Sequence, residues 1–179
     1  MQTIAEFLRE LQHPGVSRGF KLSAIAQKLD ELALPFVVIE EDKHLRLLGY
    51  GEQSIAIQVR KLKDGQLSKK PLSAKISLLS EADWDDADGW HRYFDAPHTE
   101  PVFFRLNDGT ELSFSLQSVY VCPVSADEAY SFKKRIERSG DFIFRDFGDG
   151  RVPHGVNQLG YLSDDPEQRV VLIDYPAVE

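Results

Sequence analysis

The sequence predicts an α+β fold with two N-terminal helices, a mainly antiparallel sheet of about six to eight strands, and a further helix near residues 125–138. Three observations support this prediction. Apolar residues follow helical spacing up to residue 34, short β-like runs dominate from residue 36 onward, and an Asp-Gly pair joins two of those runs. This order of elements, helices first and strands afterwards, is typical of α+β proteins.

The two N-terminal helices have clear start and stop signals. Thr3 caps the first helix, and Glu6 three residues later completes a capping box. The helix ends at 13–15, because proline and glycine both interrupt helices. A second helix is predicted from Ser23 to the residue before Pro35, with its apolar side chains on one stripe.

A third helix is predicted from Ser125 to about Arg138. Ser125 is its cap, and Glu128 completes a second capping box. Cations near its C-terminal end complement the helix dipole, and Gly140 closes it.

Strands are predicted at 36–39, 44–48, 54–62, 102–106, 111–116, 142–144 and 169–174. The turn at Asp108-Gly109, between two alternating apolar runs, is the clearest hairpin signal in the chain. Residues 72–79 alternate like a strand, but their assignment stays open. Glycine and proline recur through 148–166, which predicts a long loop.

The size and composition of the chain predict a single domain over residues 1–179. No apolar run approaches the roughly 20 residues of a membrane-spanning helix, so no membrane partner is expected. The first ten residues contain Glu6 and no apolar signal core. Cys122 is the only cysteine, which excludes an internal disulfide, and these features together predict a cytoplasmic location.

The net charge of −8 is unevenly distributed. Residues 1–75 carry 12 Lys and Arg against 9 Asp and Glu, whereas residues 76–179 carry 9 against 20. An acidic C-terminal part repels phosphate backbones and favours a basic partner. The same charges also suit a surface that only keeps the protein in solution.

The most unusual composition lies in residues 81–100, called here the acidic-aromatic segment. It holds seven carboxylates and both tryptophans of the chain. Aromatic anchors with acidic neighbours are typical of protein-recognition surfaces. The candidate binding residues are Trp84, Asp85, Asp86, Asp88, Trp90, His91 and Asp95. The alternative is a solvated acidic loop that its aromatic side chains anchor to the core.

A metal site is a second interpretation of this segment. Asp86 and Asp88 fall at ligand positions of a calcium-binding loop, but Trp84 occupies the first position, where no tryptophan can ligate. A transition-metal site has a better candidate set, which consists of Asp88, His91, Asp95 and His98. Such a site would make the chain a metal-dependent hydrolase, with His154 as a further catalytic group.

Nucleic-acid binding is a third possibility. Two helices followed by a hairpin over 36–48 are similar to a winged helix, and four cations on these elements would face phosphates: Lys21, Lys28, Lys43 and Arg46. Acidic residues at 31 and 40–42 interrupt this set, so nucleic acid is disfavoured as a partner. A modest basic cluster also surrounds the turn at 63–65.

The sequence therefore favours a non-catalytic cytoplasmic binding protein that docks its acidic, aromatic surface on a basic protein partner. An inhibitor of a basic toxin, similar to immunity proteins and antitoxins, is the most concrete form of this hypothesis. No catalytic residue and no cofactor is assigned, and the sequence carries no signal of the oligomeric state. The hydrolase and the winged-helix DNA-binding regulator are the alternatives.

Overall fold

The computed structural model describes residues 1–12, 16, 20–39, 46–51, 53–82, 99–120, 124–138 and 159–172. The chain divides into two compact units. The first unit consists of Met1–Ala87 and Pro97–Val119, and the second consists of Asp88–Ala96 and Tyr120–Glu179.

The first unit is built on one antiparallel sheet. Its strands are β1 (Gln2–Thr3), β2 (Phe36–Val38), β3 (Leu47–Tyr50), β4 (Ser54–Lys63), β5 (Gln66–Leu67), β6 (Leu72–Ser77), β7 (Val102–Arg105) and β8 (Glu111–Ser118). Six of these eight strands follow the order β1-β2-β4-β6-β8-β7, and β3 and β5 also pair with β4. The predicted α+β class and the mainly antiparallel sheet are therefore confirmed.

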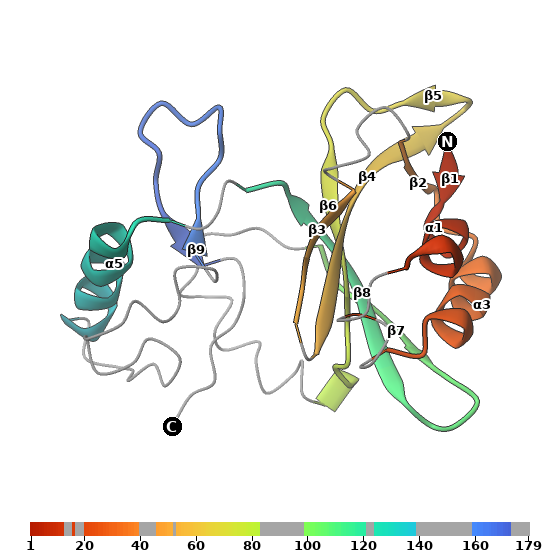
Figure 1. The fold of residues 1–179 in the computed structure, drawn as a ribbon. Helices are drawn as coiled ribbons and strands as arrows, with labels where there is room; N and C mark the ends of the chain where they lie inside the picture. The colour runs from red at the N-terminus through yellow and green to blue at the C-terminus, as the bar shows by residue number, and fades with distance from the viewer. Residues whose placement is uncertain are drawn as a thin grey trace. The chain divides into compact units, whose positions relative to one another are not determined.

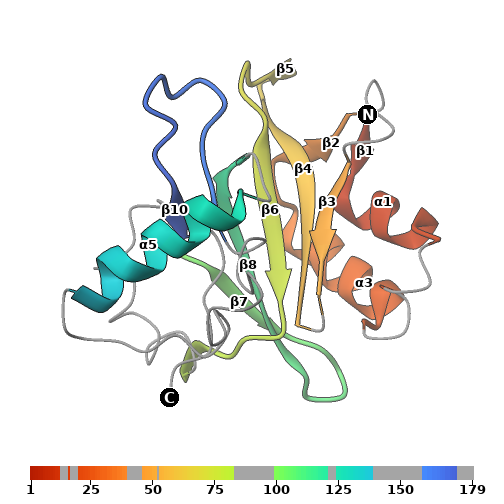
Figure 2. The same ribbon diagram turned by 60° about the vertical axis from the view of Figure 1, so that its left-hand side comes forward.

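Two helices, α1 (Ile4–Glu10) and α3 (Leu22–Leu32), cover one face of this sheet (Figure 1, Figure 2). Every second side chain of β4 faces them, because alternate residues of a strand point to opposite faces. The core that results is fully apolar at its centre. It includes Leu8, Ile25, Ile55, Ile57, Val59, Ile76 and Leu112.

The helix boundaries follow from local chemistry. The Thr3 hydroxyl accepts a hydrogen bond from the Glu6 amide at 3.1 Å, and the Glu6 carboxylate accepts one from the Thr3 amide at 2.7 Å. The predicted capping box is therefore confirmed. The second helix, α3, stops two residues earlier than predicted, because Ala33 already adopts a left-handed conformation with φ +46°.

Two tight turns connect strands in this sheet. The predicted hairpin joins β7 to β8, and Gly109 there has φ +88°, a conformation that glycine adopts without a Cβ penalty. Asp64 and Gly65 connect β4 to β5 with φ +51° and +74°, which are the positive angles of a type I′ turn.

Three strand expectations need correction or completion. The hairpin expected over 36–48 is wrong in its pairing, because β2 and β3 both pair with β4. Residues 72–77 form β6, which settles the open assignment as a strand. The long loop expected over 148–166 is wrong at Leu159–Gly160, which forms strand β9. The strand predicted at 142–144 lies outside the described residues.

The second unit contains the predicted third helix as α5 (Ala126–Arg138) and a small antiparallel pair, β9 with β10 (Val171–Leu172). The Ser125 hydroxyl accepts a hydrogen bond from the Glu128 amide at 3.2 Å, and the Glu128 carboxylate accepts one from the Ser125 amide at 2.8 Å. The second capping box is thus confirmed. Among the described residues of both units, no helix is long and apolar enough to span a membrane.

Candidate functional site

The acidic-aromatic segment connects β6 to β7. All of its nominated binding residues lie outside the described residues: Trp84, Asp85, Asp86, Asp88, Trp90, His91 and Asp95. His98, the remaining nominated metal ligand, lies outside them as well. Their roles in binding therefore stay predictions, and the structure describes only the two ends of the segment.

Both ends of the segment join strands that flank β8. Ser77, at the end of β6, pairs with Ser113, and Val102, at the start of β7, pairs with Phe114 on the other side of β8. These two positions are about 10 Å apart, since neighbouring strands are separated by about 4.8 Å. The points at which the chain leaves the sheet and returns to it are therefore only about two strand spacings apart.

Hydrogen bonds fix each end to the sheet. The Leu78 amide donates to the Gln53 carbonyl at 2.7 Å. The Thr99 amide donates to the Leu116 carbonyl at 3.0 Å, and the Leu116 amide donates to the Thr99 hydroxyl at 2.9 Å. A connection with both ends held in this way loses less conformational freedom on binding than a free tail of the same length.

A polar row lies on the face of β6 and β8 opposite to the helices. Gln117 pairs with Ser73, and Ser115 pairs with Lys75. Ser73, Ser113 and Ser115 are buried, and Gln117 is 9% exposed. The Gln117 side-chain oxygen is buried and accepts no hydrogen bond from the residues that the structure describes. This face was not nominated from the sequence, although the polar residues at 73, 75 and 77 and at 113, 115 and 117 alternate with apolar ones.

Some lysines of the described residues form ion pairs with carboxylates, and others form none. Lys21 pairs with Asp108, and Lys28 pairs with Glu31 at 2.7 Å. The Lys21 ammonium and the Thr110 amide hold the pKa of the Asp108 carboxyl well below its usual range. Two of the four cations of the winged-helix interpretation are therefore already paired with carboxylates.

The other cations of that interpretation are also accounted for. The Arg46 guanidinium donates to the Gln2 side-chain oxygen at 3.1 Å, and Lys43 lies outside the described residues. Three lysines form no ion pair in the described structure: Lys61, Lys63 and Lys69. All three lie beside the β4–β5 turn, where the sequence showed a modest basic cluster.

Metal-ligating side chains do not gather in the part of the chain that the structure describes: no group of three or more His, Cys, Asp or Glu is placed to hold an ion there. The set of Asp88, His91, Asp95 and His98 lies outside that part and stays a prediction.

Comparison with known proteins adds no family to this description. No protein-family model, no curated protein and no solved structure matches the chain. The function is therefore inferred from the chemistry of the chain's own residues.

Proposed function

We propose that the protein is a non-catalytic cytoplasmic binding protein that docks the acidic-aromatic segment on a basic protein partner. The observation that carries this proposal is the composition of 81–100, where seven carboxylates accompany both tryptophans of the chain. Tryptophans supply much of the binding energy at interface centres, and carboxylates around them select a cationic partner and speed its approach.

The way in which the sheet holds the ends of this segment also supports the proposal. Recognition residues are commonly found in connections that a rigid scaffold positions. The connection between β6 and β7 is held at both ends, by Leu78 and by Thr99. An inhibitor of a basic toxin is the most concrete form of the proposal, because an acidic surface can occlude a cationic site built for nucleic acid.

A charge-neutral triple variant tests the proposal: Asp85→Asn with Asp86→Asn and Asp88→Asn. The matched control is Glu10→Gln with Glu31→Gln and Asp127→Asn, which removes the same charge from exposed positions elsewhere. Each protein is immobilised and exposed to an extract of the source cells, and captured proteins are eluted with salt and identified.

The proposal expects basic proteins on the wild type and on the control, and their loss from the segment variant. Capture should weaken as salt rises, because salt screens exposed charges. Unchanged capture by the segment variant would end the proposal. Equal loss with the control variant would do the same, since it would attribute binding to net charge alone.

The metal-dependent hydrolase remains a second proposal, because Asp88, His91 and Asp95 follow helical spacing of three and four residues. Elemental analysis of protein purified without chelator distinguishes the two proposals. One bound transition-metal ion per chain, lost in a His91→Ala variant, would favour the hydrolase. Protein that contains no metal would remove it.

A further inference from the structure

The end of the sheet that carries the β4–β5 turn is a compact basic ribbon, defined here as residues 60–70. The Lys61 amide donates to the Ser68 hydroxyl at 3.1 Å, and the Ser68 amide donates to the Lys61 carbonyl at 2.8 Å. The Arg60 guanidinium donates to the carbonyls of Ser68 and Lys69 at 3.2 and 3.1 Å. These bonds fix the backbone from which the lysines project.

Three of the four lysines in this ribbon form no ion pair with the residues that the structure describes. Lys61, Lys63 and Lys69 are exposed and pair with no carboxylate in the described part of the chain, and Asp64 is the only acid among residues 60–70. Lys61 and Lys63 lie on the same face of β4, about 7 Å apart along the strand. A protein with a net charge of −8 thus keeps a local group of available cations at one end of its sheet.

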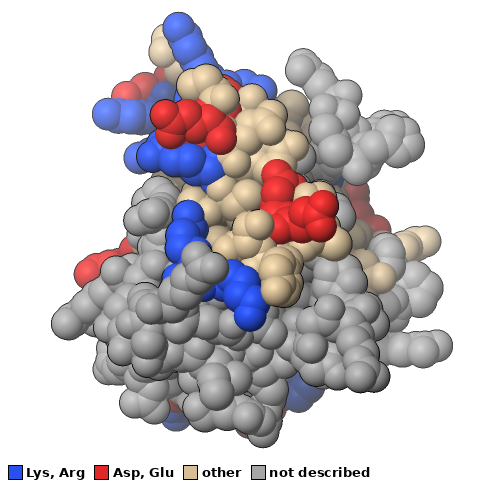
Figure 3. Space-filling model, turned by 90° about the vertical axis from the view of Figure 1, so that its left-hand side faces the viewer, with Lys and Arg blue, Asp and Glu red and all other residues tan. Residues whose placement is uncertain are grey.

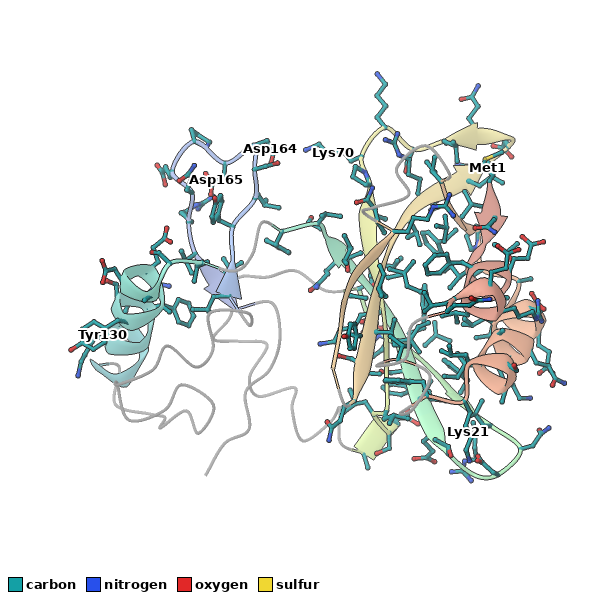
Figure 4. The ribbon with its side chains drawn as sticks, in the orientation of Figure 1. Met1, Lys21, Lys70, Tyr130, Asp164 and Asp165 are labelled. Carbon is teal, nitrogen blue, oxygen red and sulfur yellow. The ribbon has the colours of Figure 1, made fainter. Side chains whose placement is uncertain are left out.

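The figures locate this ribbon away from the paired lysines of the helical layer. Figure 4 labels Lys70 at the ribbon end of the sheet and Lys21 at the other end, beside the β7–β8 turn. In Figure 3, Lys and Arg side chains lie at the top of the face, and Asp and Glu side chains lie among them.

Apolar anchors are scarce in the same ribbon, and this selects the kind of partner. Protein interfaces draw most of their energy from buried aromatic and apolar anchors. Leu67, at 37% exposure, is the only exposed large apolar side chain among residues 60–70. Phosphate backbones need no such anchor, because release of counterions by lysine and arginine supplies the binding energy. The ribbon therefore suits phosphates better than an acidic protein.

We propose that the basic ribbon binds the phosphate backbone of a nucleic acid without reading its bases. The ribbon offers ammonium groups and no aromatic side chain for stacking, which is the chemistry of backbone contacts. The rest of the chain carries a net negative charge, which opposes binding of the same ligand there. The ribbon shares no residue with the acidic-aromatic segment, so each proposal can fail without the other.

The magnitude expected is modest. Each phosphate neutralised on a duplex changes the slope of log K against log salt by about 0.9, so three lysines give a slope near −3. Dissociation constants in the range of about 10⁻⁴ to 10⁻⁶ M are typical of such non-specific binding.

Fluorescence anisotropy with a labelled DNA duplex of mixed sequence, titrated at several salt concentrations, tests the proposal. The test variant is Lys61→Gln with Lys63→Gln and Lys69→Gln, which leaves the main-chain bonds of the ribbon in place. Its control is Arg9→Gln with Lys21→Gln and Lys28→Gln, which removes the same charge from the helical layer. Circular dichroism confirms that each variant is folded.

The wild type and the control should bind, and the ribbon variant should lose at least about tenfold in affinity at low salt with a salt slope smaller by about 2 to 3. A duplex of different sequence should bind equally. Absence of wild-type binding, or equal binding by the ribbon variant, would overturn the proposal. Binding of poly-glutamate in place of the duplex would also overturn it, and would assign the ribbon to an acidic protein.

Discussion

Truncation of Ile57 to alanine tests most directly how the sheet and the helices share a core. Ile57 is fully buried in the middle of β4, between Leu47 on β3 and Ala74 on β6. The change removes three carbon groups, each worth about 0.8 kcal/mol on transfer from water. That gives about 2.4 kcal/mol, and the cavity left behind raises the expected cost to about 3–4 kcal/mol.

Urea unfolding followed by far-ultraviolet circular dichroism measures this cost. A loss of about 3 kcal/mol lowers the unfolding midpoint by about 1–3 M urea, since the denaturant slope is about 1–3 kcal/mol per molar. The control is Gln58→Ala, one residue further along β4 on the opposite, polar face. Its cost should stay below about 1 kcal/mol, as for an ordinary surface change. Equal costs for the two variants would refute the assignment of faces.

Two further predictions concern a turn and a helix cap. Gly109→Ala should destabilise the protein by about 1 kcal/mol, because Gly109 has φ +88°. The control Gly49→Ala should be nearly neutral, since Gly49 does not have a positive φ. Equal thermal midpoints for the two variants would contradict this prediction. Hydrogen bonds from Ser125 lower the pKa of Glu128 from its ordinary 4.5. The ionised Glu128 carboxylate therefore stabilises the folded state above pH 4.5, and this stabilisation is lost as the pH falls through the lowered pKa. Between about pH 7 and about pH 3, the urea midpoint should therefore fall less in Glu128→Gln than in the wild type. The control Asp127→Asn should behave like the wild type. Identical pH profiles for all three proteins would show that the cap is absent in solution.

The elements that the sequence predicted best are those that depend on near neighbours. Both capping boxes, at Thr3 and at Ser125, involve residues only three apart, so their signal is complete within one helical turn. The Asp108-Gly109 hairpin is equally local. In each case the residues that define the structure also supply its hydrogen bonds.

Predictions failed where the decisive partner is distant in sequence. The pairing of β2 with β4 rather than β3 depends on contacts between Phe36 and Lys61 and between Val37 and Arg60. Two-residue strands such as β9 have too few side chains to show alternation. The serines at 73 and 115 are visible in the sequence, but that they lie in one buried row with Gln117 follows only from the sheet order, because β6 and β8 are far apart in the chain.

The exposure of the candidate binding residues also depends on partners that are distant in sequence. Composition identified 81–100 as unusual, but it does not reveal which side chains reach solvent, since exposure depends on what packs around them. The basic ribbon shows the converse case. Its lysines were visible in the sequence, but only the structure distinguished Lys61, Lys63 and Lys69 from lysines paired with carboxylates.

Acrylamide quenching of tryptophan fluorescence tests the central proposal most directly, because Trp84 and Trp90 are the only tryptophans and both belong to the acidic-aromatic segment. The proposal predicts strong quenching in the free protein, as for exposed side chains, and protection when the basic partner captured by the chain is added. Weak quenching in the free protein, unchanged by that partner, would place both tryptophans in the core and contradict the recognition surface.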